Sequence, residues 1–252
     1  MMTPTASRTE EVLRLLKERT SASIPELAVK IGVSEMTVRR DLQKLAESGQ
    51  VIRIPGGARV ARAISFERSF AERLEKAASA KDRIGRLAAS LVKEKEAVVL
   101  DSGTTTLFIA RHLRQHHDVL VFTFSLAALE ELSDVESVRV ELTGGIYRRS
   151  SHDLVGHSVS DGLRRLCANK VFFGAAAVSL TRGVMVYDPD APRALLESAH
   201  ERILVVDSSK IGIAALHQFC PLENCDLIIT DAGIKPDDLE RLREVTKVLI
   251  AE

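Results

Sequence analysis

Apolar and polar positions over the first sixty residues predict three helices separated by polar breaks. Residues 8–19 carry apolar side chains at helical spacing and end in a Thr-Ser-Ala-Ser break. Ser23 can cap a second, short helix over residues 24–31, whose proline stands in the first turn, where a missing N–H costs nothing. Gly32 then turns the chain into a third helix that begins at Ser34.

The third helix has one narrow apolar face and a charged outer face. Val38, Leu42 and Leu45 recur at helical spacing and should point inward. Gly49 offers a C-terminal stop. At about 100° per residue, six positions point outward or lie on the flanks: Met36, Thr37, Arg39, Arg40, Gln43 and Lys44. An outer face rich in arginine suits DNA, although an ordinary solvated helix has the same pattern.

A hairpin is predicted directly after this helix. Two strand-like runs, residues 51–54 and 58–60, are joined by Pro55-Gly56-Gly57, which is typical of a tight turn. Helix, short helix, glycine turn, longer helix and hairpin follow the order of a winged helix-turn-helix domain. This context favours DNA binding over the solvated-helix interpretation. The residues expected to contact DNA are Ser34, Met36, Thr37, Arg39, Arg40, Gln43, Lys44, Arg53 and Gly57.

Residues 61–82 are helix-prone and heavily charged, with acidic and basic side chains intermixed. We interpret them as a connector outside the packed core. An amphipathic helix is predicted to follow over residues 81–93, with Ile84, Leu87 and Leu91 on one side.

From residue 97 onward, short apolar runs alternate with helical patterns. The predicted strands are 97–100, 119–123, 138–142, 171–173, 203–206, 227–230 and 248–251, and the predicted helices are 105–114, 126–132, 159–166, 191–200 and 237–244. Hydrophobic strands separated by helices predict a mostly parallel sheet covered on both faces. The expected fold is therefore α/β, with a winged helix-turn-helix domain over residues 1–60, a helical connector over 61–82 and a larger Rossmann-type domain over 83–252.

Four of the predicted strand ends carry hydroxyls, glycines, carboxylates or a lysine. Ligands of open α/β sheets bind at the carboxyl ends of strands, so these residues are candidates for one site: Asp101, Ser102, Gly103, Thr104, Thr105, Thr123, Ser125, Gly144, Gly145, Asp207 and Lys210. Hydroxyls, a helix N-terminus and a lysine can bind phosphate, and carboxylates can accept from sugar hydroxyls. Each strand end alone could be turn chemistry, but four together favour a phosphorylated polyol.

The charge distribution and the apolar runs limit the class of protein. The 252-residue chain has a formal net charge of zero, but residues 1–60 hold ten Lys and Arg against seven Asp and Glu. This modest asymmetry fits a small basic reader of DNA joined to a domain with another task. No apolar run reaches membrane-spanning length and the N-terminus lacks a signal-peptide h-region, so we expect a cytoplasmic protein.

The cysteines and histidines are not expected to hold a metal. Cys167, Cys220 and Cys225 are too few for a disulfide framework. Cys220 and Cys225 could share a metal, but no second pair stands nearby, so buried apolar packing is the preferred interpretation. Five of the seven histidines fall at a predicted helix end (His112, His116, His117) or in a polar loop (His152, His157), and they are expected on the surface. We therefore expect neither a metal nor a cofactor.

The motifs of both halves resemble the DeoR family of transcriptional regulators over essentially the whole chain. The N-terminal match is Thr37-Val38-Arg39-Arg40-Asp41-Leu42 with Gly56-Gly57-Ala58, and the C-terminal matches are Asp101-Ser102-Gly103-Thr104-Thr105, Gly144-Gly145, Gly156, Gly174, Gly183 and Asp207-Ser208-Ser209-Lys210. The resemblance implies that Arg39 and Arg40 contact double-stranded operator DNA. It also implies a sensor domain related in fold to ribose-5-phosphate isomerase and glucosamine-6-phosphate deaminase. The expected protein is a homo-oligomeric repressor, a dimer or tetramer, of carbohydrate-metabolism genes that is released by a small-molecule effector, a sugar phosphate.

The chain departs from the family's pattern in three places, which bear on the choice of effector. Phe124 stands where the family commonly has asparagine, and Ala177-Val178-Ser179 where it often has Gly-Ile-Asp. Arg193 stands where the family often has lysine after a proline.

An alternative interpretation is a sugar-phosphate isomerase or deaminase with a DNA-binding appendage. Such chemistry needs a carboxylate base beside the carbon that loses its proton. Similar isomerases place acidic residues just after the strand that here ends near Gly174, whereas residues 175–179 contain none. We therefore expect no catalytic residue and no enzyme. A metal- or redox-sensing regulator is a third interpretation, and the His and Cys spacings give it little support.

Overall fold

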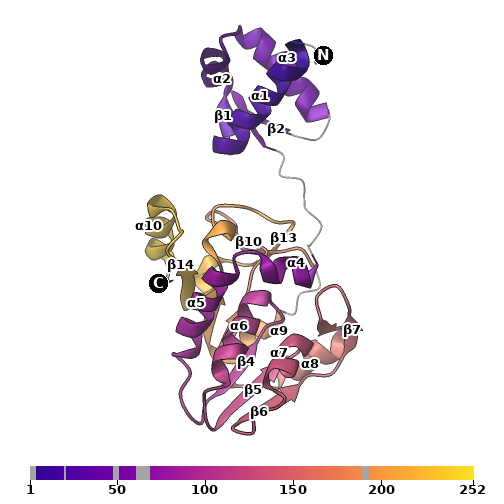
Figure 1. Cartoon of the computed structure of the whole chain (residues 1–252), viewed down its shortest axis with the longest axis vertical. Coiled ribbons are helices and arrows are strands. Elements are labelled where there is room, and N and C mark those ends of the chain that lie inside the picture. The colour runs from indigo at the N-terminus through magenta and orange to yellow at the C-terminus, as the bar shows by residue number, and fades with distance from the viewer. Residues whose placement is uncertain (1–3, 20, 48–50, 61–68, 189–192) are drawn as a thin grey trace. The chain divides into compact units, whose positions relative to one another are not determined.

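The chain divides into two compact units, residues 1–65 and 66–252, each with its own hydrophobic core (Figure 1). The computed structural model describes residues 4–19, 21–47, 51–60, 69–188 and 193–252. The predicted helix stop at Gly49 and residues 61–68 of the predicted connector lie outside the described residues.

The first unit contains three helices and a small antiparallel sheet. The chain runs through α1 (Pro4–Arg19), β1 (Ser21–Ser23), α2 (Ile24–Ile31), α3 (Glu35–Glu47), β2 (Val51–Ile54) and β3 (Gly57–Val60). The strands lie in the order β1-β3-β2, so the hairpin β2–β3 is extended by the strand that precedes α2. The three predicted helices and the hairpin are present. Strand β1 was not predicted, because three residues, Ser-Ala-Ser, carry no strand pattern of their own.

The core of the first unit includes the three α3 positions that the helical spacing selected. Val38, Leu42 and Leu45 of α3 are buried together with Leu16 of α1 and Leu27 of α2. Burial of one apolar stripe from each helix fixes which side of α3 remains outside.

The second unit is built on a seven-stranded sheet in which all neighbouring strands are parallel. Its order is β15 (Lys247–Ala251), β14 (Leu227–Asp231), β12 (Ala199–Val205), β9 (Ala168–Phe173), β4 (Ala97–Leu100), β5 (Val119–Thr123) and β6 (Val138–Leu142). The predicted mostly parallel α/β fold is confirmed. Since all seven strands run in one direction, their carboxyl ends meet at one edge.

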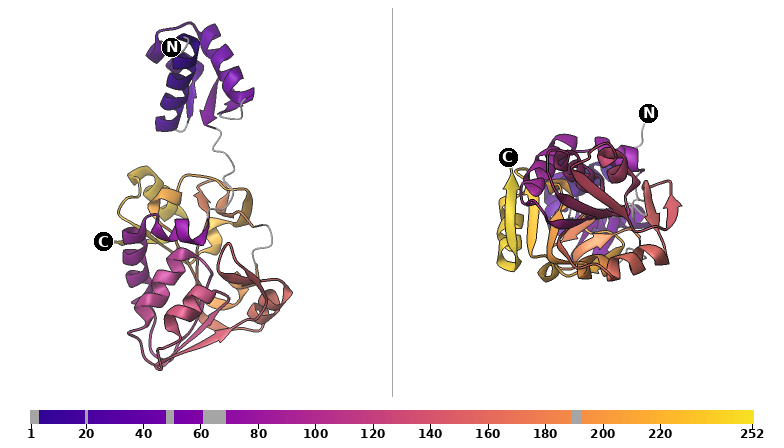
Figure 2. Two further views of the ribbon diagram at one scale, coloured as in Figure 1. Left: turned by 45° about the vertical axis from the view of Figure 1, so that its right-hand side comes forward. Right: turned by 90° about the horizontal axis from the view of Figure 1, so that it is seen from below.

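Helices cover both faces of this sheet (Figure 2). One face is covered by α5 (Ala78–Ala89), α6 (Thr104–Leu113) and α7 (Leu126–Leu132), whose Ile84, Ile109 and Ala128 share a core with the strands. The other face is covered by α8 (His157–Arg164), α9 (Ala194–Glu197), α10 (Pro236–Val245) and a small sheet of β10 (Ala177–Ser179), β11 (Gly183–Val186) and β13 (His217–Cys220). Short 3-10 turns lie at Ser208–Lys210 and Leu222–Asn224.

The described part of the predicted connector belongs to the second unit. Residues 69–82 contribute α4 (Phe70–Glu75) and the start of α5, and Lys81 is only 2% exposed. The backbone N–H of Phe70 donates to the carbonyl oxygen of Ser150 at 3.0 Å, in the turn between β7 (Ile146–Arg148) and β8 (Asp153–Val155). A charged composition suggested a solvated connector, but the hydrogen bond to Ser150 and the burial of Lys81 show that this segment packs on the second unit.

One predicted helix is largely wrong. Residues 191 and 192 are outside the described residues, and only Ala194–Glu197 of the predicted 191–200 segment is helical. Strand β12 already begins at Ala199, where it pairs with Ala168 of β9. Pairing in the sheet therefore overrides the local helix preference of the alanine- and leucine-rich segment.

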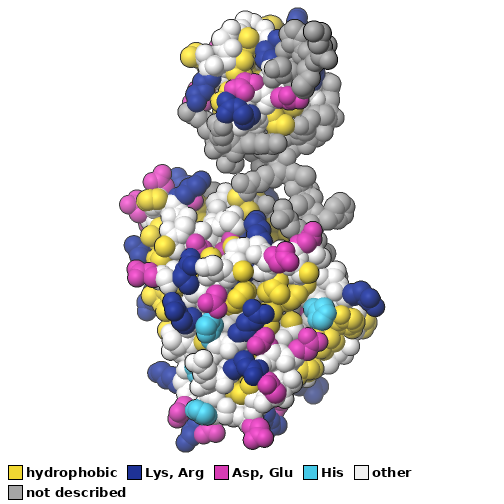
Figure 3. Space-filling view, viewed as in Figure 1, with side chains coloured by type: hydrophobic (Ala, Val, Ile, Leu, Met, Phe, Trp, Pro, Cys, Tyr) yellow, Lys and Arg dark blue, Asp and Glu magenta, His cyan; other side chains and the backbone are white. Residues whose placement is uncertain are grey.

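Charge on the second unit is mixed. On the face shown in Figure 3, basic and acidic side chains are interspersed over the second unit. Because the surface charges on this face are mixed, the buried charges are more informative about a ligand site.

Candidate functional site

The turn between α2 and α3 is held by local backbone chemistry. Gly32 has φ 73° and ψ 36°, the left-handed conformation that closes α2 and that glycine adopts without steric cost. At the start of α3, Ser34 Oγ accepts from the backbone N–H of Thr37 at 3.2 Å and lies 2.9 Å from Thr37 Oγ1. The two hydroxyls predicted to contact DNA therefore also cap the helix that carries the other candidates.

The outer face of α3 is exposed as its spacing predicted. Met36, Arg39, Arg40, Gln43 and Lys44 are exposed, while the opposite face is buried. Exposed arginines and lysines can neutralise phosphates, and the first residues of such a helix can reach base edges.

A partly buried ion pair links α3 to α1. Asp41 is 1% exposed and accepts two hydrogen bonds from Arg8 of α1, at 2.6 and 3.1 Å. Asp41 therefore serves the fold, although it stands among the arginines of the motif.

The hairpin is linked to α3 through one candidate pair. Arg53 Nη1 of β2 donates to Gln43 Oε1 at 2.9 Å, which joins the two surfaces expected to meet DNA. Gly57 is different, because it is buried against β1, where an added Cβ would lie 2.3 Å from the carbonyl oxygen of Ala22. Gly57 thus has a packing role, and its contact with DNA stays a prediction.

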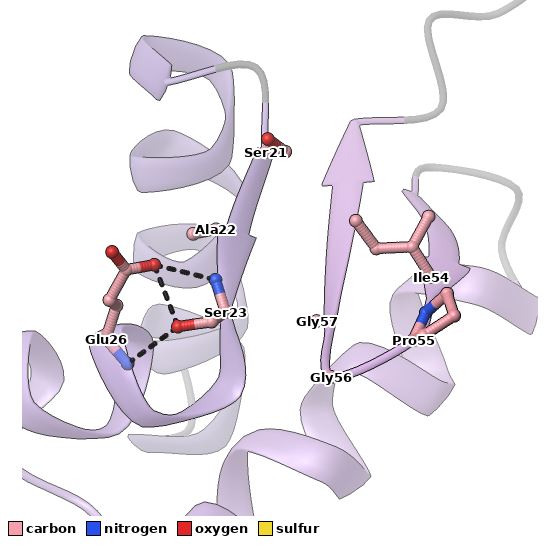
Figure 4. Close-up of a pocket in the computed structure, with 8 residues that line it drawn as sticks. All are labelled: Ser21, Ala22, Ser23, Glu26, Ile54, Pro55, Gly56 and Gly57. Carbon is pink, nitrogen blue, oxygen red and sulfur yellow. Dashed lines mark hydrogen bonds between the residues drawn. The ribbon is translucent and has the colours of Figure 1, made fainter.

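A shallow pocket lies between β1 and the hairpin turn (Figure 4), lined by Ser21, Ala22, Ser23, Glu26, Ile54, Pro55, Gly56 and Gly57. Its acidic side chain, Glu26, accepts from the backbone N–H and the hydroxyl of Ser23, both at 2.8 Å. Because this carboxylate completes the cap of α2, the pocket offers little chemistry for a ligand.

In the second unit, the loop after β4 begins with a carboxylate that bridges two strands. Asp101 accepts from the backbone N–H of Ser102 at 2.7 Å and from that of Gly174, after β9, at 3.0 Å. Burial raises the pKa of Asp101 above its ordinary value, against the influence of these N–H groups.

The start of α6 has the form of an anion site. Gly103 occupies the N-cap and has no side chain with which to bond the first N–H groups of the helix. Thr104 and Thr105 are 3% and 2% exposed. The hydroxyl of Thr106 lies 2.6 Å from the carbonyl oxygen of Asp101 and 2.7 Å from that of Gly103, which fixes the shape of the loop.

Two predicted effector residues, Thr123 and Ser125, make hydrogen bonds within the fold. Thr123 Oγ1 donates to the carbonyl oxygen of Leu100 at 2.8 Å and accepts from the N–H of Ser125 at 3.0 Å. Ser125 Oγ caps α7 by accepting from Ala128 N–H at 3.1 Å. Both side chains are almost fully buried, and their contact with an effector stays a prediction. Phe124, one of the departures from the family's pattern, is also buried.

Gly144 and Gly145 form the turn from β6 to β7, with φ of 74° and 140°. This turn leads into a polar network that sequence reasoning missed. Ser102 Oγ donates to Asp153 Oδ2 at 2.7 Å, and the fully buried Asp153 accepts from Arg148 at 2.9 and 2.7 Å. Arg148 also pairs with Asp188, and the hydrogen bond to Asp153 raises the pKa of the guanidinium. The spacing of these residues along the sequence does not predict that their side chains contact one another.

Lys210 and Asp207 lie after β12, as predicted. Lys210 Nζ donates to the carbonyl oxygen of Ala175 at 2.6 Å. Burial lowers the pKa of Lys210, while the charges of Asp207 and, more weakly, Asp101 act in the opposite direction. The influence of Asp101 indicates that the β4 and β12 strand ends share one electrostatic environment.

A second lysine, Lys81 of α5, joins this environment. Its Nζ donates to the carbonyl oxygen of Arg73 in α4. Burial, followed by the positive charge of Lys210, lowers the pKa of Lys81 to about 8. The sequence held a signal for it: Lys81 lies three and seven residues before the buried Ile84 and Ala88, and therefore on the apolar face of α5.

Two features are absent from the described part of the chain, a cluster of metal-ligating side chains and a membrane-spanning helix. Among the residues that the structure describes, no group of three or more His, Cys, Asp or Glu is placed to hold a metal ion. No helix of the described segments is long and apolar enough to cross a membrane.

Two family models match different parts of the chain. A family model described as "DeoR-like helix-turn-helix domain" matches residues 8–63, and one described as "DeoR C terminal sensor domain" matches residues 76–232. Among solved structures, ribose 5-phosphate isomerase A from Methanocaldococcus jannaschii aligns over 52% of this chain and 53% of its own, with 18% identity and a TM-score of 0.38.

Several curated relatives match over nearly their whole length. The HTH-type transcriptional regulator YgbI of Escherichia coli strain K12 is 34% identical over 97% of each chain. The HTH-type transcriptional repressor GlcR of Bacillus subtilis is 32% identical over 87% of this chain and 86% of its own. The lactose phosphotransferase system repressor of Lactococcus lactis is 31% identical over 97% of this chain and 98% of its own. The chain therefore belongs to the DeoR family of helix-turn-helix transcriptional regulators.

Proposed function

We propose that the chain is a repressor of carbohydrate-metabolism genes and that a phosphorylated sugar releases it from its operator. The name of one relative, the lactose phosphotransferase system repressor, supports the gene class. The second unit supports the effector class.

The observation that carries the proposal is the gathering of anion-binding groups at one edge of the parallel sheet. The start of α6 has glycine at its N-cap, and Lys81 and Lys210 hold buried amines in the same electrostatic environment as Asp101 and Asp207. Uncapped N–H groups and ammonium groups bind phosphate, whereas carboxylates accept from sugar hydroxyls. We therefore centre the proposed effector site on Asp101, Gly103, Thr104, Thr105, Asp207, Lys210 and Lys81.

Repression requires two states of an oligomer. We propose a dimer or tetramer whose α3 helices read equivalent half-sites of double-stranded DNA in the cytoplasm. Effector binding would favour an arrangement with different reader spacing. A coupling of about 1–3 kcal/mol would change operator affinity roughly 5–150-fold.

We infer that the chain does not convert its effector. Residues 175–179 supply no carboxylate beside the strand end at Gly174. The carboxylate of Asp101 contacts that strand end, because it accepts from the backbone N–H of Gly174. It also accepts from the backbone N–H of Ser102, and the two bonds fix its position.

The test begins with selection of an operator from a random duplex library by the full chain. A panel of sugar phosphates is then screened by thermal shift, in which a ligand at 100 times its Kd adds about 2.7 kcal/mol of stability. A hit should release the selected operator in a mobility-shift titration. Nuclear magnetic resonance of the same mixtures should show the sugar phosphate unchanged after prolonged incubation. Failure to enrich any sequence, or turnover of a panel member, would contradict the proposal.

Arg40→Ala tests the DNA-binding half. If Arg40 contacts phosphate, affinity should fall similarly on all sequences and the salt slope should decrease by about one. If Arg40 reads guanine, specificity should relax at one base by about 1–3 kcal/mol. A mobility-shift titration over several salt concentrations separates these results, and unchanged operator affinity would rule out both.

A further inference from the structure

We propose that Met36 determines operator specificity by contacting the 5-methyl group of a thymine in the major groove. The inference rests on the proposed function, because it concerns the operator that the first unit reads. It goes beyond the proposed function by assigning one side chain, Met36, to one chemical group of the operator, the thymine methyl.

The position of Met36 places it where base edges are read. Met36 is the second residue of α3 and is 61% exposed. It shares a stripe of the helix with Arg40 and Gln43, four and seven residues later, opposite the buried face. The N-terminal residues of a recognition helix are those that contact base edges.

The polar side chains next to Met36 in the sequence already form hydrogen bonds or an ion pair at the start of α3. Ser34 Oγ caps α3 through Thr37 N–H and bonds the Thr37 hydroxyl. The Glu35 carboxylate lies 3.7 Å from Arg39 Nη2 one turn later. Met36 therefore presents an apolar surface in a turn whose hydroxyls already have partners.

The side chain of Met36 is not part of the hydrophobic core of the first unit. Val38, Leu42 and Leu45 supply the buried face of α3, and Met36 lies on the other side. Its apolar surface therefore remains available for burial against DNA, where removal from water is favourable.

The chemistry of the side chain selects its target. A thioether has no hydrogen to donate and is only a weak acceptor, so it cannot satisfy the polar edge of a base. The apolar group that base pairs present in the major groove is the thymine methyl. An unbranched, polarizable side chain can adjust to that methyl.

The experiment removes the methyl group alone. In the selected operator, each thymine is replaced in turn by uracil, and the binding of the wild-type chain and of Met36→Ala is measured by fluorescence anisotropy. At one thymine in each half-site, uracil should weaken wild-type binding about fourfold, the factor for burying one methylene-sized group. Met36→Ala should bind the thymine operator more weakly and should no longer distinguish thymine from uracil there.

Two further variants test whether the thymine preference depends on Met36 in particular. Val29→Ala removes an even more exposed apolar side chain, 82% exposed, from α2 in the same unit, and it should retain the full thymine preference. Met36→Leu keeps an apolar contact and should retain part of that preference.

The inference is overturned if the wild-type chain shows no methyl dependence at any thymine, or if Met36→Ala keeps the full dependence at every thymine. Failure of the wild-type chain to select any operator would be a different result. It would overturn the proposed function and this inference with it.

Discussion

Lys81 and Lys210 of the second unit carry ammonium groups whose pKa is lowered by burial. Each amine is largely removed from water, and each donates to one backbone carbonyl, of Arg73 and Ala175 respectively. Burial of an ammonium group beside another positive charge disfavours its protonated form. An anionic ligand would reverse that effect, so this residue pair links proton binding with effector binding.

Replacement of Lys210 by alanine should separate the two functions. Loss of a charge-assisted hydrogen bond to phosphate should weaken effector binding by about 1.5–3 kcal/mol. Operator binding without effector should remain near normal, because α3 lies in the other unit. Mobility-shift titrations with and without effector measure both affinities. A Lys210→Ala chain that releases DNA at the wild-type effector concentration would place the ligand elsewhere.

The pKa of Lys81 predicts a pH dependence of effector binding. Because this pKa is lowered to about 8, Lys81 is mostly protonated at pH 7 and mostly neutral at pH 9. A phosphate monoester, whose second pKa is about 6, is already doubly charged over this range. Effector affinity should therefore fall by up to about tenfold between pH 7 and pH 9. Isothermal titration calorimetry at both pH values measures the change.

Lys81→Arg is the matched control for this pH dependence. A guanidinium keeps its charge at pH 9, so this variant should bind the effector with little pH dependence even if its affinity at pH 7 is lower. A wild-type chain whose affinity rises between pH 7 and pH 9 would contradict the assignment. A Lys81→Arg chain as pH-dependent as the wild type would show that another group is responsible.

At the scale of elements, close packing of α5 on α6 places Lys81 and the Gly103 loop. Gly85 of α5 allows this contact, because a Cβ there would lie 2.7 Å from backbone and Cβ atoms of Phe108. Backbone atoms cannot rotate away from a clash as a side chain can. Gly85 therefore couples the position of the helix that carries Lys81 to the helix that begins at the anion site.

Gly85→Ala should destabilise the second unit. Overpacking costs about 1–3 kcal/mol, and the better helix propensity of alanine offsets up to about 1 kcal/mol. The net effect should lower the thermal midpoint by a few degrees, roughly 2–4 °C per kcal/mol. Gly103→Ala is the control for stability, since the nearest atom to its Cβ would be 3.4 Å away and its φ is −76°. Equal midpoints for Gly85→Ala and wild type, followed by circular dichroism, would show that the two helices can move apart freely.

Elements with a strong period could be predicted from the sequence, whereas contacts between distant loops could not. The helix over residues 126–132 and the strand over 119–123 were predicted with their observed bounds. The short strands β10 and β11 were missed because three or four residues carry little pattern, and their pairing is decided by tertiary contacts.

The same limit applies to the candidate site. Lysine at residue 210 could be placed at the sheet edge because it follows a buried strand. Asp153 could not, because its partners Ser102 and Arg148 are determined by how the β7–β8 hairpin folds back on the loop after β4. The hydrogen bond of Thr123 could not be predicted for a related reason: a hydroxyl at a strand end can bond a neighbouring strand as readily as a ligand.

At the scale of the whole molecule, the proposed repressor acts by the spacing of two DNA readers. One α3 helix covers only a few base pairs, so specific affinity depends on two first units binding one duplex together. Half-sites on one side of DNA are about 34 Å, or about 10 base pairs, apart, or a multiple of that distance. The selected operator should accordingly contain an inverted repeat, and sedimentation analysis should show at least two chains on each duplex.

Insertions between the two half-sites test this geometry directly. Five added base pairs turn one half-site to the opposite side of the duplex, so only one reader can bind well and the effective concentration of the second is lost. Affinity should fall more than tenfold and approach that of a duplex with one half-site, which is the matched control. Ten added base pairs restore the rotational phase and should be less harmful than five. If the five-base-pair insertion leaves affinity unchanged in an anisotropy titration, the readers are not held at a fixed spacing. Effector control would then have to act on a single reader, because a change of spacing could no longer release the DNA.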